Sequence, residues 1–238
     1  YHHPEVIFPE DYLFWCYKEA DKYFPYNKLM LNEVTKSWFD YNYENTHFYL
    51  ILENLLLRGA RIDGIGLQYH LFGGKDQLRE NRDIILNPEH LFKILDLYGK
   101  FNLPIHVSEI TIPAYSNEVE DEERQKKLVE NLYKLWFSHP ESEAIVWWNL
   151  KDGEAWQDEG ELKGGLLREN FSKKPAYKVL EDLINNQWVT ELTLSGKSKY
   201  KFRGFYGEYN LDVEYKGKQF NKHIHLSDTS PNQFQIEL

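Results

Sequence analysis

Helical and strand-like spacings of apolar residues alternate along the first three quarters of the chain. Residues 9–25 place apolar side chains at helical spacing and end at Pro25, which predicts an amphipathic helix. The short apolar segment 27–34 predicts a strand, and the order of helix and strand then repeats. Further helices are expected over residues 43–60, 87–101, 118–139 and 174–187, and further strands over 63–72, 103–110 and 143–150.

This alternation predicts an α/β protein with a parallel sheet, because neighbouring parallel strands need a helical crossover between them. Asn87 and Pro88 are suited to begin the helix over 87–101. An Asn side chain can cap the first N–H groups of a helix, and Pro at the first helical position lacks an N–H that would otherwise go unbonded.

The period changes to two from about Trp188 onward. Residues 189–195, 200–217, 219–227 and 232–238 alternate apolar and polar positions and are separated by Gly, Ser, Asn and Pro. We therefore expect a first domain over residues 1–187 and a small antiparallel β-sandwich-like module over 188–238. His223 and His225 would share one side of a strand there, but two imidazoles without a third ligand favour a solvated face over a metal site.

Composition narrows the class of partner. The formal net charge of −10 argues against nucleic acid, whose phosphates select clustered Lys and Arg. Cys16 is the only cysteine, which excludes an internal disulfide and a multi-cysteine metal site. No apolar run is long enough to span a bilayer, and any export signal would have to lie upstream of Tyr1. Aromatic residues make up 16% of the chain, enough flat apolar surface for sugar faces as well as for a large core.

The four predicted strands end in polar or aromatic residues. The carboxyl ends of parallel strands share one edge of a sheet, so these side chains should gather there. Carboxylate, amide, imidazole and indole together are typical of a sugar site: amides and imidazole bond hydroxyls, indole stacks on a ring face, and a carboxylate attacks the anomeric carbon. The residues are Asn32, Glu33, Gln68, His70, Glu109, Trp148 and Asn149.

Five segments carry a family resemblance in chain order. They are KLMLNEV (28–34), GIGLQYHL (64–71), LPIHVSEITIP (103–113), AIVWWNLKDGEAW (144–156) and KPAYKVLEDLI (174–184). Together they resemble the second half of a glycoside hydrolase family 10 endo-β-1,4-xylanase, over about Pro9 to Ile184. The resemblance implies the C-terminal half of a (β/α)8 TIM barrel, strands 5–8, followed by the β module.

By this resemblance Glu109 takes the place of the retaining nucleophile, with Ser108 where Thr is usual. Gln68 and His70 match the Gln-x-His pair whose imidazole holds the nucleophile. Trp148 and Trp156 match the tryptophans that bind the glycone sugars, and Trp147, on the other side of the strand, is expected in the core.

Two features depart from the family pattern. Asn32 with Glu33 resembles the Asn-Asp on the fifth strand, but Val34 stands where a subsite tyrosine would be. Asp152, by contrast, matches the Asp between the two tryptophans. By the resemblance, the acid/base glutamate of the family belongs to the fourth strand, and we expect this chain to begin after that strand.

A purely structural role remains an alternative for several of these residues. Glu109 could be a strand-end capping carboxylate, His70 a core histidine, and Trp148 and Trp156 core residues. Asn-Glu at Asn32 and Glu33 also resembles the acid/base motif of related barrel glycosidases. That interpretation requires two strands between Glu33 and the Glu109 strand, and only one is predicted.

The resemblance implies retaining hydrolysis of xylan by two carboxylates, of which this chain supplies the nucleophile, with no metal and no organic cofactor. Its expected partners are xylan or xylo-oligosaccharide and an N-terminal barrel half in cis or in trans, without nucleic acid or a membrane span. A secreted, periplasmic or cell-surface location is expected. Two rival hypotheses are an inactive glycan-binding half-barrel and a structural piece that works only with a separate N-terminal half.

Overall fold

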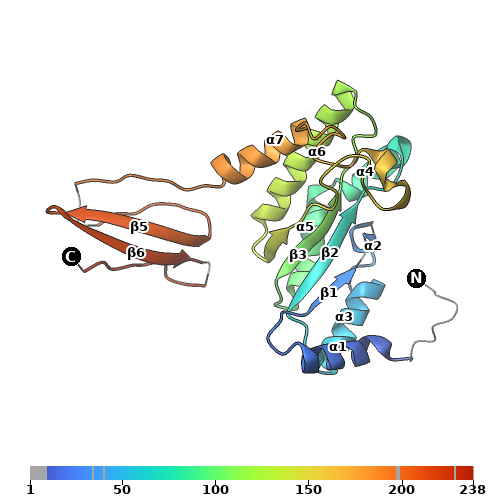
Figure 1. The fold of residues 1–238 in the computed structure, drawn as a ribbon. Helices are drawn as coiled ribbons and strands as arrows, with labels where there is room; N and C mark the ends of the chain where they lie inside the picture. The colour runs from blue at the N-terminus through green and yellow to red at the C-terminus, as the bar shows by residue number, and fades with distance from the viewer. Residues whose placement is uncertain (1–9, 34, 40, 197–198, 228, 238) are drawn as a thin grey trace. The chain divides into compact units, whose positions relative to one another are not determined.

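The computed structural model describes residues 10–33, 35–39, 41–196, 199–227 and 229–237 (Figure 1). The chain divides into two compact units, residues 1–180 and 181–238. Among the helices described, none is long and apolar enough to cross a membrane.

A four-stranded parallel sheet forms the centre of the first unit, in the order β1-β2-β3-β4. Its strands are β1 (Met30–Glu33), β2 (Gly64–His70), β3 (Ile105–Thr111) and β4 (Ser142–Ile145). The helices are α1 (Tyr12–Tyr23), α2 (Lys36–Phe39), α3 (His47–Leu57), α4 (Lys75–Ile85), α5 (Pro88–Gly99), α6 (Val119–Ser138) and α7 (Pro175–Asp182), with short turns η1 (Tyr43–Asn45) and η2 (Gln157–Leu162). The predicted α/β class with a parallel sheet is confirmed.

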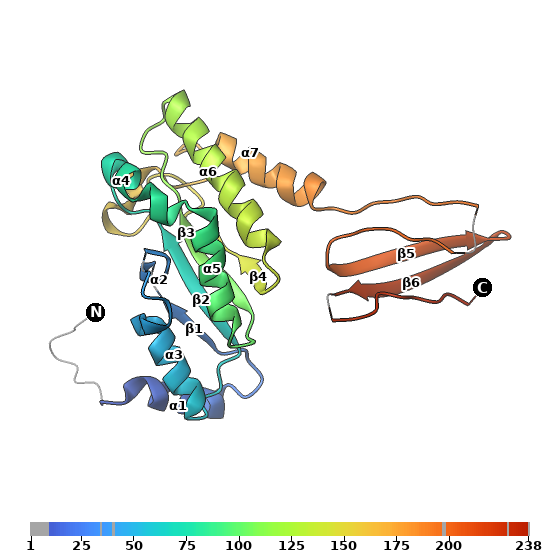
Figure 2. The same cartoon turned by 180° about the vertical axis from the view of Figure 1, so that it is seen from behind.

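Helices α3, α5 and α6 cover one face of this sheet (Figure 2). Alternate residues of β2 turn to that face, where Ile65, Leu67 and Tyr69 are buried. Tyr69 lies edge-on between Trp38, with ring centroids 5.6 Å apart, and Trp136, at 5.1 Å. These large rings fill the layer between sheet and helices, so the apolar core lies on one side and the opposite face carries the polar strand residues.

The sequence signals at α5 are confirmed in detail. The Asn87 side chain accepts hydrogen bonds from the N–H groups of Glu89 and His90, and Pro88 is the first helical residue. This cap satisfies donors that a helix start would otherwise leave unbonded. The cap therefore fixes the residue at which α5 begins.

The elements differ from the predictions in three places of the first unit. Helices α2 and α4 were not predicted, and β4 ends at Ile145, before the predicted end at Leu150. The backbone beyond β4 still follows β3, since Val146 N donates to Val107 O at 2.9 Å and Trp148 N donates to Ile110 O at 3.1 Å. The chain therefore keeps to the sheet edge until Trp148, with looser pairing than a regular strand.

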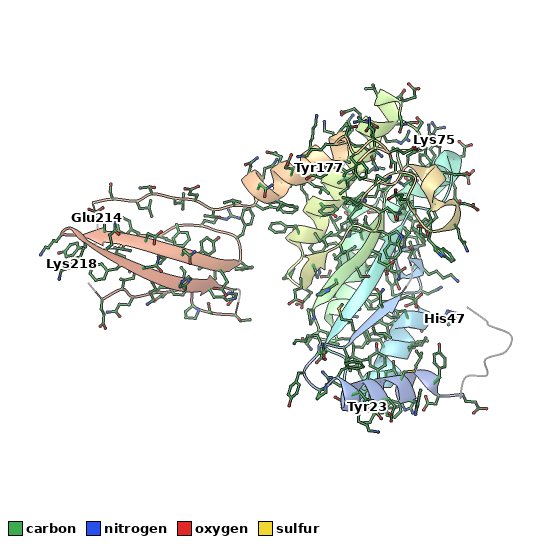
Figure 3. All side chains as sticks on the ribbon, in the orientation of Figure 1. Tyr23, His47, Lys75, Tyr177, Glu214 and Lys218 are labelled. Carbon is green, nitrogen blue, oxygen red and sulfur yellow. The ribbon has the colours of Figure 1, made fainter. Side chains whose placement is uncertain are left out.

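The second unit contains one antiparallel hairpin, β5 (Gly207–Tyr215) and β6 (Lys218–Leu226), preceded by a π-helical turn η3 (Leu183–Gln187). Its two-residue turn is Lys216-Gly217, both with positive φ, at 51° and 76°. Such a turn matches the twist of the paired strands. Figure 3 labels Glu214 and Lys218 at this turn end of the hairpin.

The prediction of further strands in this unit is wrong. Residues 189–195, 200–206 and 232–237 alternate in sequence but form no strand, so the described part is a hairpin and not a sandwich. His223 and His225 share the polar face, where His225 Nδ1 lies 2.8 Å from Glu208 Oε1.

Candidate active site

A β-bulge aims Glu109 at the edge of the sheet. Gly66 pairs with His106 and Gln68 pairs with Glu109, so β3 has one more residue than β2 over this stretch. A bulge of this kind redirects the side chains that follow it. As a result two consecutive residues reach one partner: Ser108 Oγ donates to Asn32 Oδ1 at 2.6 Å, and Asn32 Nδ2 donates to Glu109 Oε1 at 3.2 Å.

Three side chains from two strands surround the Glu109 carboxylate. Asn32 and Gln68 both donate to Oε1, the latter from Nε2 at 3.1 Å, and His70 Nε2 lies 3.4 Å from Oε2. The Glu109 side chain remains 20% exposed. Burial raises its pKa, the hydrogen bond from Asn32 opposes that rise, and the negative charge on Glu159 adds to it. Glu109 is thus a positioned, partly accessible carboxylate.

Gly66 permits the approach of Asn32 to this carboxylate. A Cβ atom at Gly66 would lie 2.2 Å from Asn32 Oδ1 and 2.9 Å from its Cγ. Because no real Cβ comes that close, any other residue would push the Asn32 side chain away. A missing side chain on β2 therefore makes the hydrogen bond between β1 and β3 possible.

His70 is buried in its neutral form. Desolvation lowers its pKa to about 4, because the protonated imidazole would lose its hydration without full compensation. Its Nδ1 lies 2.9 Å from Thr111 Oγ1, and its backbone N–H donates to Thr35 Oγ1 at 3.0 Å. If the Thr111 hydroxyl donates to Nδ1, the remaining proton sits on Nε2 and points at Glu109.

Trp148 and Trp156 form an open aromatic surface next to the carboxylate. Their exposed fractions are 46% and 51%, high for indole side chains, and a pocket of about 530 Å³ is lined by Trp148, Asn149, Glu154, Ala155 and Trp156. Trp148 lies edge-on to His70, with ring centroids 6.1 Å apart. Its Nε1 donates to Glu159 Oε2 at 3.1 Å. Exposed indoles beside hydrogen-bonding groups suit stacking on a sugar ring.

The neighbouring Trp147 turns the other way. Its Nε1 donates to Asn149 O at 2.9 Å and to Gly164 O at 3.2 Å, and its ring lies 6.3 Å from that of Tyr133 on α6. The Trp147 indole therefore packs inward, whereas the Trp148 indole faces outward.

Asp152 lies below the aromatic surface and not on it. Its side chain and that of Lys174 are both 0% exposed, and Lys174 Nζ donates to both carboxylate oxygens at 3.2 Å. Gly165 N donates to Asp152 Oδ1 at 2.8 Å, and Lys174 Nζ also donates to Lys163 O at 2.8 Å. This buried ion pair ties the loop that carries the tryptophans to the start of α7.

The structure brings most of the predicted site residues together. Asn32, Gln68 and His70 each contact Glu109, and the two tryptophans line one pocket near them. Glu33 follows Asn32 in β1 and so points to the opposite face of the sheet. Consistently, its charge adds to the effect of burial in raising the pKa of Tyr98, a core residue of α5. Val34 lies outside the described residues.

Several contributing residues were not predicted: Thr35, Gly66, Thr111, Glu159 and Lys174. Of these residues, only Gly66, the second glycine of GIGLQYH, could have been found from the sequence, since a glycine inside a strand often marks a close approach of another group. The others depend on tertiary contacts. In the part of the chain that the structure describes, no group of three His, Cys, Asp or Glu side chains could hold a metal ion.

Comparison with known proteins identifies the family. Residues 4–183 match the sequence profile of glycosyl hydrolase family 10. The chain is 31% identical over 174 residues to the anti-sigma-I factor RsgI6 of Acetivibrio thermocellus, covering 71% of this chain and 20% of that protein. It is 28% identical over 192 residues to endo-1,4-beta-xylanase B of Thermotoga neapolitana, covering 77% and 49%.

The fold matches solved xylanase structures in part. Xylanase 10B of Thermotoga petrophila RKU-1, solved in complex with xylobiose, superposes with a TM-score of 0.59 at 21% identity, over 75% of this chain and 52% of that one. The chain spans about half or less of the length of these relatives. The parallel sheet is accordingly part of a xylanase-like barrel, and the chain belongs to glycosyl hydrolase family 10.

Proposed function

We propose that this chain carries the nucleophile of a retaining endo-β-1,4-xylanase and that Glu109 is that nucleophile. The observation that carries the proposal is the Glu109 carboxylate, held by Asn32, Gln68 and His70 beside the exposed Trp148. A nucleophilic carboxylate must be ionised, and the amide donors on Oε1 favour its charged form.

In the proposed reaction a xylose ring stacks on Trp148 and Trp156 and presents its anomeric carbon to Glu109. The Glu109 oxygen forms an ester to that carbon while the glycosidic C–O bond breaks, and a second carboxylic acid gives its proton to the leaving oxygen. Water, activated by the same second group, then cleaves the ester and restores Glu109. Neutral His70 keeps the nucleophile in one orientation through both steps.

We further propose that the sheet is strands 5–8 of the barrel, its C-terminal half, within a domain of residues 1–187, and that residues 188–238 are a separate module. The order of the family motifs along the chain supports this. So does α1, none of whose side chains is buried, because a crossover helix packs against the strand before it as well as the strand after it. The second carboxylic acid then comes from an N-terminal half. Export to the cell surface or beyond is part of the proposal, since xylan is an extracellular polymer.

The test replaces Glu109 with Gln in the assembled barrel. Hydrolysis of xylan should fall by several orders of magnitude while binding of xylotetraose is retained, because Gln keeps the shape but cannot form the ester intermediate. Glu120→Gln on the exposed side of α6 is the matched control and should leave hydrolysis unchanged. Turnover close to wild type in Glu109→Gln would reject the assignment.

A second candidate is a glycan-binding domain without hydrolysis. The match to an anti-sigma-I factor favours it, because that name describes a regulator. The same experiment separates the two: binding of xylotetraose with no release of reducing sugar from the assembled wild-type protein would favour the binding role.

A further inference from the structure

A second carboxylate faces the site from η2. Glu159 is half-buried, and its Oε2 accepts the hydrogen bond from Trp148 Nε1 at 3.1 Å. Trp148 lies edge-on to His70, which in turn lies 3.4 Å from Glu109 Oε2. One indole and one imidazole therefore connect Glu159 to Glu109. The charges of the two carboxylates also interact: after burial, Glu159 is the group that raises the pKa of Glu109.

The negative charge of Glu159 is not neutralised locally. The lysines of this region pair with other carboxylates: Lys151 with Glu154, Lys163 with Glu169, and Lys174 with Asp152. Among the described residues no Lys or Arg forms an ion pair with Glu159.

The hydrogen bond gives Glu159 a positioning role in addition to its charge. An indole ring whose N–H is bonded at its rim cannot rotate away without losing that bond. The plane of Trp148 is thereby fixed relative to Glu109, as a stacked sugar requires for a productive orientation.

We propose that Glu159 is a positioning and specificity-determining residue of this site: it fixes the Trp148 indole and selects uncharged sugar chains over chains bearing a uronic acid near that ring. This rests on the proposed function, because it takes a sugar to stack on Trp148. A uronate carboxylate held near Trp148 would be repelled by Glu159, whereas an unsubstituted xylose would not.

Two substitutions separate the roles of Glu159. Glu159→Gln removes the charge but keeps an oxygen that can accept the Trp148 hydrogen bond, and Glu159→Ala removes both. Glu161→Gln, which neutralises an exposed carboxylate on the same η2 turn, is the matched control.

The experiment measures affinity by calorimetry for xylotetraose and for the same oligosaccharide carrying one glucuronic acid, using the full chain in its assembled barrel. Wild type and Glu161→Gln should prefer the neutral sugar by about threefold to tenfold, and 0.5 M NaCl should reduce that preference. Glu159→Gln should lose the preference and keep its affinity for xylotetraose. Glu159→Ala should lose the preference and also bind xylotetraose more weakly.

A second readout follows Glu109 itself. Glu159→Gln should shift the acid limb of kcat/KM towards lower pH, because removing a nearby negative charge lowers the pKa of Glu109. If the assembled protein binds but does not hydrolyse, the same shift is measured on the Glu109 carboxyl carbon by NMR. Binding without hydrolysis, together with this NMR shift, rejects the xylanase proposal and leaves the proposed role of Glu159 intact.

Other outcomes overturn the inference. Equal affinity of the wild type for both oligosaccharides, or an undiminished preference in Glu159→Gln, shows that Glu159 does not select by charge. Unchanged xylotetraose affinity in Glu159→Ala rejects the positioning role. Failure of the wild type to bind either sugar rejects this inference together with the proposed function.

Discussion

At the scale of single residues, His70 links the site to the stability of the fold. Its pKa of about 4 in the folded protein lies below the 6.5 of an unperturbed histidine, so the unfolded chain takes up the proton first as the pH falls. Stability from this group is therefore fully present above about pH 6.5 and is lost between there and pH 4. The loss should reach about 3 kcal/mol.

Urea denaturation at pH 7 and pH 4.5 measures this effect. His70→Gln should flatten the dependence on pH by most of that amount, while the exposed His47→Gln should follow the wild type (Figure 3). Equal slopes for wild type and His70→Gln would show that His70 is not held neutral.

Gly66 is the residue whose absent side chain the site requires. Gly66→Ala should displace Asn32 from Glu109, because the new Cβ would overlap Asn32 Oδ1. We expect kcat/KM for xylotetraose to fall by about 10- to 100-fold in the assembled barrel, as misplaced catalytic groups do elsewhere. Gly74→Ala, where nothing lies within 4 Å of the new Cβ, is the control and should retain activity within about twofold. A loss confined to stability, with turnover intact, would contradict this role.

Sequence alone placed Asn32, Gln68, His70 and Glu109 in one cluster for a simple reason. The ends of neighbouring parallel strands must share an edge, so residues at those ends must meet. The bulge that turns Ser108 and Glu109 toward the same partner is a property of two strands in contact, and no pattern within one strand reveals it. Glu159 was beyond reach for the same reason, because its contact with Trp148 depends on the path of η2.

At the scale of elements, the predictions succeeded where burial imposes a clear period. Helices α5 and α6 each present a continuous buried stripe to the sheet, and that stripe is visible in the sequence. Helix α4 is mostly polar, with few apolar residues to mark a buried face, so its sequence resembles a loop. In the second unit the error was the opposite, because strands were predicted over 189–195 and 232–237 where none forms. Alternation of apolar and polar residues suits a strand, but a strand also needs a partner to pair with.

The loop of the tryptophans depends on the buried pair Asp152–Lys174. Lys174→Met should destabilise the protein by about 3–5 kcal/mol, because it leaves the Asp152 carboxylate buried without a counter-charge. The double variant Asp152→Asn, Lys174→Met should recover part of that loss, since no charge then remains buried. Urea denaturation measures both, with Lys178→Met on the exposed side of α7 as control. A single variant as stable as the wild type would contradict this role of the ion pair.

At the scale of the whole molecule, the first unit has the properties of part of a barrel. In the described residues β1 and β4 each pair on one side only, and the sheet face that carries the site is not covered by α3, α5 or α6 (Figure 2). Unpaired parallel edges are unstable in water unless another chain or segment covers them. Glu33 is the carboxylate of β1 and follows the site residue Asn32. Its side chain points into the helical layer and away from Glu109.

We therefore predict that the 238-residue chain alone releases no reducing sugar from xylan at a significant rate, and that an N-terminal barrel half, in cis or in trans, restores activity. In the proposed reaction Glu109 attacks the anomeric carbon, but an alkoxide leaves slowly without a positioned acid. Lack of general-acid catalysis alone costs about 10²- to 10⁴-fold in rate, and the missing barrel wall that should orient the sugar adds to it. The assay compares the isolated chain with the assembled pair and includes Glu33→Gln, which should leave the activity of the pair intact. Robust hydrolysis by the isolated chain, abolished in Glu33→Gln, would instead make Glu33 the acid/base and require it to turn to the other face of β1.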